Sequence, residues 1–170
     1  MKNIIKIKAH INRFVFIVYI VFLSTSCFMN KEEMPDDFNF IAIYGIAEEN
    51  NINTFDSTFT KKINWDKDST IALIFPINEK QKIFNLIRDF EIEKYPINFQ
   101  PKSNKDISPF PTYYLLFKIN GIIYEINWEI NTSSNERRAM KLRDIFSHID
   151  NYIKNEKAYL CIPEDERIVF

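Results

Sequence analysis

The sequence predicts an α+β domain with a five-stranded antiparallel sheet, in the element order βββ-α-ββ-α, and both helices covering one face of the sheet. Three observations support this fold class. One segment reads as an aromatic hairpin, two segments have the apolar period of a helix, and three short segments before the first helix read as strands. We expect a single domain over residues 38–170, because about 130 residues suit one hydrophobic core.

The clearest local signal is the hairpin YYLLFKINGIIYEINWEI at residues 113–130. Asn120-Gly121 is the preferred pair for a two-residue type I′ turn. Such a turn sets every cross-strand pair, out to Tyr113 opposite Trp128. One face of the hairpin is then apolar and aromatic, and the mixed opposite face should meet water.

Three strands are expected before the first helix, and they should form a meander. They are 38–47, 54–65 and 71–75, with the polar run EENNIN as the link between the first two. The second alternates with period two, which is typical of a strand. Its apolar side carries Phe55, Phe59, Ile63 and Trp65.

Two amphipathic helices complete the predicted fold. The first follows Asn78 as N-cap, with Gln81 as its capping-box partner, and the second follows Ser133, with Glu136 as its partner. Between the first helix and the hairpin, residues 95–111 contain four prolines. This segment is either a mobile flap or a packed irregular loop.

Residues 1–26 are typical of a signal peptide. Residues 1–13 carry four basic side chains and no acidic one, and residues 14–23 are uninterrupted apolar side chains. A membrane-spanning helix needs about 20 apolar residues. We therefore expect this segment to be removed from the mature protein.

The small residues Ser24-Thr25-Ser26 before Cys27 resemble a lipobox, at which a bacterial lipoprotein is acylated on its cysteine and cut just before it. Leu23 stands four residues before the cysteine, where the commonest lipobox has leucine at three. Acyl chains on Cys27 would hold the protein at a membrane, at about 0.8 kcal/mol per buried methylene. The alternative is an ordinary signal peptide that releases a soluble protein with a free cysteine.

Residues 27–37 are polar and acidic, and we expect them to form a tether. Lys31-Glu32-Glu33 resembles the short signal that sends some lipoproteins to the outer face of the outer membrane. A merely solvated linker is the other reading of these three residues. The expected location is the bacterial cell envelope, lipid-anchored at the outer membrane, on its periplasmic or surface face.

The charge and the glycine content exclude two classes of partner. The chain has a net charge of −1, and removal of the basic signal peptide leaves about −5. An acidic domain does not fit nucleic acid. Gly45 and Gly121 are the two glycines of the chain, so no glycine-rich phosphate loop can be written and no nucleotide is expected.

The two cysteines leave one question open. If Cys27 carries lipid, Cys161 has no partner in the chain, and we expect it to be a buried small apolar residue. A disulfide between the two is the competing interpretation, and it requires an unmodified Cys27.

The sequence predicts no catalytic residue, no metal site and no cofactor. His148 is the single histidine after the signal peptide, and we expect it at the edge of the second helix, with Ser147 and Asp150 pointing elsewhere. Glu125 and Glu129 share one strand face roughly 13 Å apart, whereas glycosidase carboxylates lie within about 10 Å. The carboxylates Asp56, Asp66 and Asp68 fit a charged turn better than a cation site.

A binding surface is the remaining possibility. The hairpin aromatics are needed for the core beneath the helices, which leaves the mixed face and the proline-rich segment. The residues that we expect on this surface are Tyr114, Lys118, Glu125, Tyr95, Phe99 and Phe110.

Several short motifs together resemble a family of small uncharacterised bacterial lipoproteins. They are Tyr44-Gly45, Asn53-Thr54-Phe55-Asp56, Thr60-Lys61, the two capped helices and Pro163, and they cover most of residues 38–163. The resemblance implies a lipid anchor and a single domain. It implies no activity, because the family has no established one.

The leading hypothesis is a non-enzymatic, lipid-anchored envelope protein that binds a protein or envelope component through the outer sheet face and the proline-rich loop. One alternative is an immunity or inhibitor lipoprotein, in which an acidic surface captures a protein toxin or enzyme. Another is a hydrolase of envelope polymers that uses Glu125 and Glu129. A pocket joining these two carboxylates would favour the hydrolase.

Overall fold

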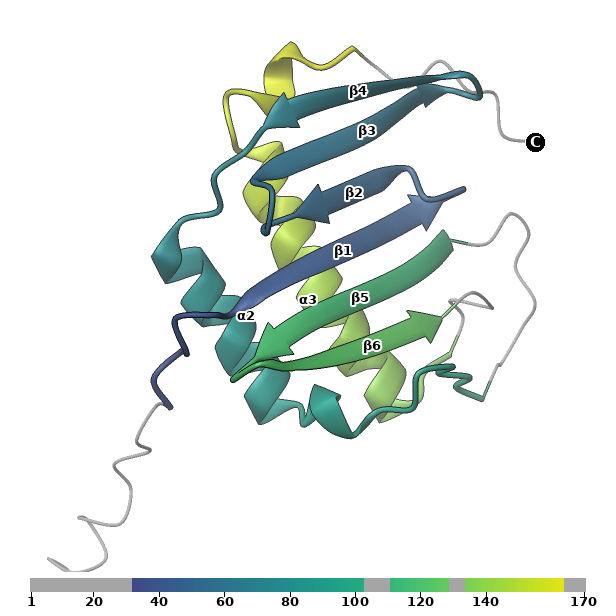
Figure 1. Cartoon of the computed structure of the whole chain (residues 1–170). Coiled ribbons are helices and arrows are strands. Elements are labelled where there is room, and N and C mark those ends of the chain that lie inside the picture. The colour runs from purple at the N-terminus through teal and green to yellow at the C-terminus, as the bar shows by residue number, and fades with distance from the viewer. Residues whose placement is uncertain (1–31, 103–110, 129–133, 164–170) are drawn as a thin grey trace, which may run out of the picture. The chain divides into compact units, whose positions relative to one another are not determined.

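A six-stranded antiparallel sheet organises the folded chain, with the strand order β4-β3-β2-β1-β5-β6 (Figure 1). The computed structural model describes residues 32–102, 111–128 and 134–163. All of these except Glu32 belong to one unit, residues 33–170. The strands are β1 (Asn39–Ile46), β2 (Asn50–Asn53), β3 (Thr58–Asn64), β4 (Lys67–Ala72), β5 (Pro111–Ile119) and β6 (Ile122–Trp128).

Both helices of the described chain, α2 (Ile77–Asp89) and α3 (Arg137–Lys154), lie on the same face of this sheet (Figure 1). The short 3-10 turns η1 (Ile92–Lys94) and η2 (Tyr159–Cys161) follow them. The predicted α+β class with an antiparallel sheet and two helices is confirmed. The sheet leaves its other face without a helix from the described residues.

The predicted count of five strands is wrong, because the link between the first two predicted strands contains a strand of its own. In β2, Asn50 and Ile52 face the core and alternate with Asn51 and Asn53. Three of these four residues are asparagine, so the strand has no apolar period in the sequence. The side chain of Asn53 then accepts the backbone N–H of Phe55 at 3.0 Å and closes the turn into β3.

The predicted hairpin register is confirmed. Tyr113 lies opposite Trp128, and the turn residues Asn120 and Gly121 have φ of 51° and 80°. These positive values are those that a type I′ turn requires. The carboxylate of Asp37 accepts the backbone N–H groups of both turn residues, at 3.0 Å and 2.6 Å. The chain that enters the domain is therefore held on the hairpin turn.

The core lies between the sheet and the two helices. From the sheet it takes Phe40, Phe59, Phe117 and Trp128, and from the helices Ile83, Phe84, Ile87, Leu142, Ile145, Phe146 and Ile149, each at most 2% exposed. Burial of each such side chain contributes about 1.5–3 kcal/mol. The buried apolar residues of both helices recur every three or four positions, as predicted.

Several predicted details are wrong at the ends of elements. Phe55 and Trp65 are 42% and 70% exposed, because each lies in a turn outside the ends of β3. Strand β4 covers 67–72, so the predicted strand 71–75 begins too late. Cys161 is exposed rather than buried, because it lies in η2, beyond the end of α3.

The predicted helix caps also differ from the structure. Pro76, with an extended backbone, is the N-cap of α2, and no side chain caps the helix. Asn78 is therefore inside the helix, and Gln81 accepts the backbone N–H of Met34 at 3.3 Å. For α3, Ser133 lies outside the described residues and Glu136 is itself the N-cap.

Candidate functional site

The outer face of the sheet, opposite the helices, carries an apolar patch with charged neighbours. We call Ile41, Ile43, Tyr114, Leu116 and Ile123 the outer patch. Four of them are half-buried and Ile123 is 61% exposed. Ile41 pairs with Leu116 and Ile43 with Tyr114 across β1 and β5, so the patch is continuous.

Three predicted surface residues lie on this face. Tyr114 belongs to the outer patch, Lys118 is half-buried and pairs with Asp37 at 3.7 Å, and Glu125 is exposed opposite Leu116. Burial raises the pKa of Tyr114, and a hydrogen bond to the Glu125 carboxylate adds to this shift. The phenol is the donor in this hydrogen bond, and the carboxylate accepts it.

Tyr95 and Phe99, which were also predicted on the surface, lie in the core at 8% and 4% exposure. The chain at Asn98 pairs with Asn127 along the edge of β6. This pairing places the Phe99 ring edge-on to Trp128, with centroids 5.6 Å apart. The start of the proline-rich segment is thus packed. Phe110, the last predicted surface residue, lies outside the described residues.

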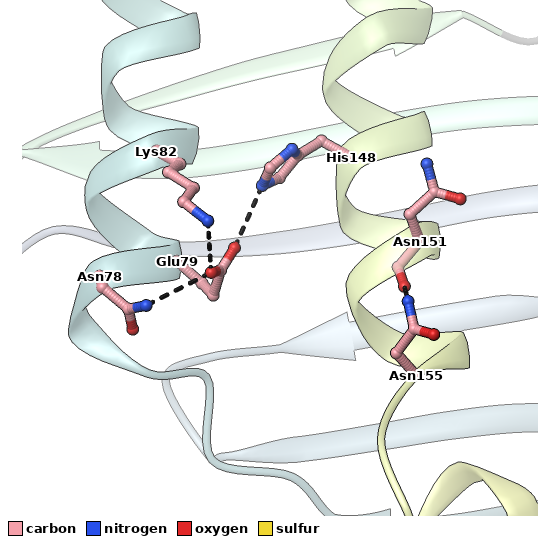
Figure 2. Close-up of polar contacts among 6 residues, drawn as sticks. All are labelled: Asn78, Glu79, Lys82, His148, Asn151 and Asn155. Carbon is pink, nitrogen blue, oxygen red and sulfur yellow. Dashed lines mark hydrogen bonds and ion pairs between the residues drawn. The ribbon is translucent and has the colours of Figure 1, made fainter.

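His148 joins the two helices (Figure 2). Its Nε2 lies 3.2 Å from Oε2 of Glu79, and Nζ of Lys82 lies 2.7 Å from Oε1 of the same carboxylate. The hydrogen bond from Lys82 lowers the pKa of Glu79, and that from His148 contributes further. The side chain of Glu79 is only 13% exposed. Oε2 of Glu79 therefore connects α2 with α3, and Oε1 is held by Lys82 within α2 itself.

A cleft of about 270 Å³ lies between the sheet and α3, and we call it the Tyr44 cleft. Its sheet wall includes Tyr113, Tyr44 and Asn50, which are cross-strand neighbours on β5, β1 and β2. The same row continues to Lys61 on β3, which pairs with Asn50 but does not line the cleft. The rest of the helix-covered face is apolar, so this row is a polar end of the core. Phe146, Ser147 and Asp150 line the cleft from α3.

Two of the charged residues that line the Tyr44 cleft, Asp150 and Lys154, are paired with each other. The other two, Glu49 and Arg143, also have interaction partners, and Arg143 donates to the Ser134 carbonyl at 2.8 Å. The Tyr44 hydroxyl donates to Oδ1 of Asp150 at 3.1 Å, and Nζ of Lys154 lies 2.6 Å from Oδ2. Burial raises the pKa of the Tyr44 phenol, and the charge of Asp150 raises it further. The hydrogen bond to Asp150 raises the pKa of Lys154. The Asp150 carboxylate is therefore occupied on both oxygens.

Lys61, at the β3 end of the row, is buried at 9% exposure. Its Nζ lies 3.5 Å from the Tyr159 hydroxyl and 5.3 Å from the centroid of the same ring. The aromatic face and the hydroxyl replace part of the hydration that the lysine side chain loses on burial.

Asn50 is the exception in this cleft. It is 8% exposed, and within the described part of the chain its side-chain amide makes no hydrogen bond. The fully buried side-chain polar atoms without a partner in the described chain are Oδ1 of Asn51 and Oε2 of Glu93, so the Asn50 amide keeps some accessible surface. Its neighbours Tyr113 and Ser147 have hydroxyls that are likewise not hydrogen-bonded to any described residue.

The prediction from sequence missed the Tyr44 cleft, although one signal was present. Lys61 has the same parity in its strand as Phe59 and Ile63, so alternation places a lysine on the buried face. The contribution of Asn50 is not visible in the sequence, because β2 has no apolar period of its own.

The hydrolase hypothesis needs Glu125 and Glu129 together. Glu125 is exposed on the outer face and does not line the Tyr44 cleft, and Glu129 lies outside the described residues.

Among the described residues, no group of three or more histidine, cysteine, aspartate or glutamate side chains is placed to hold a metal ion. The Asp56 carboxylate accepts from the side chain of Asn53 at 2.7 Å.

Comparison of the chain with models of protein families, with curated proteins and with solved structures finds no match. Within the described residues, no helix combines the length and the apolar character needed to cross a membrane.

Proposed function

We propose that the protein is a lipid-anchored protein of the bacterial cell envelope whose domain binds an envelope component or a protein without catalysing a reaction. The observation that carries the binding role is the uncovered outer face of the sheet. There the outer patch lies beside Lys118 and Glu125, so apolar area adjoins both signs of charge. Half-buried apolar residues rimmed by polar ones are typical of interaction surfaces.

The anchor is proposed from the sequence around Cys27. Glu33, where the folded unit begins, is the sixth residue after Cys27, and six extended residues span at most about 20 Å. The hydrogen bonds that the hairpin turn donates to the Asp37 carboxylate hold the entering chain on the domain. A lipid on Cys27 would therefore keep the domain within a short distance of the membrane.

A binding role is favoured over hydrolysis by the position of Glu125. Its side chain is exposed on an open sheet face, and its hydrogen-bond partner is Tyr114. A carboxyl group that acts as a general acid typically lies in a water-poor pocket. An open face does not supply such a pocket.

Metabolic labelling with a palmitate analogue tests the anchor. The wild-type protein should be labelled and recovered with membranes, whereas Cys27→Ala should be unlabelled. Cys161→Ala is the matched control and should be labelled as the wild type is, because it is the other cysteine of the chain. Equal labelling of wild type and Cys27→Ala would remove the anchor from the proposal.

Site-specific crosslinking in intact cells tests the binding surface. A photoreactive amino acid at Tyr114 should give a discrete adduct, and the same group at Asn151, an exposed position on α3, should not. The adduct at Tyr114 should weaken when Leu116→Asp places a charge in the outer patch. Equal crosslinking from both positions, or none from Tyr114, would contradict a specific outer-face interaction.

A further inference from the structure

We propose that the Tyr44 cleft is a second binding site, on the helix side of the sheet, and that it takes one neutral sugar residue. This site rests on the proposed function only for the source of the sugar, which would be an envelope glycan. The cleft is separate from the outer patch, because Tyr113 and Tyr114 are neighbours on β5 and point to opposite faces of the sheet.

The size of the cleft limits the ligand. At about 270 Å³ it lies just below the range of roughly 300–1,000 Å³ that is usual for small-molecule sites. A ligand of one ring fits this volume, whereas a polymer could place only its terminal unit inside.

The charges favour a neutral ligand. Asp150 already accepts from Tyr44 at 3.1 Å and pairs with Lys154 at 2.6 Å, so a charged ligand would compete with an existing ion pair. The other charged residues of the lining, Glu49 and Arg143, have interaction partners as well, and Arg143 donates to the Ser134 carbonyl. A hydroxyl can instead add to the carboxylate without displacing either partner, because each carboxylate oxygen has two lone pairs.

The groups without partners favour a ligand with several hydroxyls. The Asn50 amide, 8% exposed, offers both a donor and an acceptor and has no hydrogen bond to any described residue. The hydroxyls of Tyr113 and Ser147 also line the cleft, and each can donate and accept. A sugar ring presents the same mixture of donors and acceptors around its edge.

The aromatic walls suit the faces of a sugar. Tyr113 and Phe146 line the cleft with ring centroids 4.9 Å apart, and Phe146 packs on Tyr44 at 5.7 Å. The C–H groups on one face of a sugar ring can pack on such rings while its hydroxyls reach the polar row. Aromatic rings and groups that can form hydrogen bonds with hydroxyls thus line the same cleft.

The test is titration calorimetry on the full-length protein in a zwitterionic detergent without a sugar headgroup. Glucose, galactose and N-acetylglucosamine are the probes, with glycine and inorganic phosphate as charged competitors. We expect saturable binding of at least one sugar that neither competitor displaces. Binding of none of the three sugars by the folded protein, or their displacement by glycine or phosphate, would overturn the proposal.

Matched variants locate the binding. Tyr113→Phe and Ser147→Ala should each weaken sugar binding by about 3- to 10-fold, the effect of one lost hydrogen bond, and Tyr114→Phe should leave it unchanged. Asn50→Leu should weaken it further, and the other two variants decide the outcome if Asn50→Leu does not fold. Equal effects of Tyr113→Phe and Tyr114→Phe would overturn the assignment.

Cys27→Ala separates this proposal from the proposed function. Sugar binding should be the same in wild type and Cys27→Ala, because Cys27 lies outside the domain. Sugar binding without lipid labelling would refute the anchor and support the cleft. Lipid labelling without sugar binding would refute the cleft alone.

Discussion

Replacement of Trp128 by alanine should remove a large part of the stability of the domain. Trp128 is 1% exposed, and its ring lies 5.2 Å from Tyr113 and 5.6 Å from Phe99, measured between centroids. Its loss leaves a cavity against both rings, because neighbours in a packed core relax only partly. Such truncations cost about 3–5 kcal/mol. For a domain of this size the melting temperature should fall by roughly 10–18 °C.

Trp65→Ala is the matched control for this prediction, because it removes the same side chain from a position that is 70% exposed. It should cost less than about 1 kcal/mol. Urea unfolding of the full chain, followed by far-ultraviolet circular dichroism, measures both losses without depending on tryptophan fluorescence. A loss for Trp128→Ala as small as that for Trp65→Ala would refute the packing of the hairpin against the helices.

Two further predictions concern the hairpin turn. Replacement of Asn120-Gly121 by Val-Val should cost roughly 2–4 kcal/mol, because both positions have positive φ, and an unchanged melting midpoint would contradict the turn. The backbone N–H of Gly121, more than any other group, lowers the pKa of Asp37 below its usual 3.8. The stability that Asp37 contributes is therefore complete above its unfolded pKa and is lost as pH falls through the lower folded pKa. Between about pH 5 and pH 3, the free energy of unfolding should fall less for Asp37→Asn than for wild type. Equal decreases, measured by urea unfolding at each pH, would argue against the contact.

The sequence was most informative where local chemistry decides the structure. Asn120-Gly121 prefers one turn type, and the period of two along the flanking strands then allows only the register in which Tyr113 meets Trp128. The helical stripe of α3 was equally clear, because Leu142, Ile145 and Ile149 repeat at the spacing of one helix face. Each of these signals lies within one short segment.

The sequence was least informative where the chain uses polar residues in regular structure. The strand β2 is almost entirely asparagine, so its pairing with β1 depends on the neighbours and not on its own pattern. Tyr95 and Phe99 looked available for binding because prolines surround them. Their burial follows from the pairing of Asn98 with Asn127, a contact between segments distant in the chain.

By itself the sequence determined the α+β class, the hairpin register and the two helical faces, and it supplied the prediction of an anchor at Cys27. Only the tertiary structure decided that Tyr113, Tyr44, Asn50 and Lys61 form one row beneath α3. The physical reason is that a turn or a helical stripe is set by residues near in the chain. A row across four strands depends instead on the relative registers of all four, which the packing of the whole domain selects.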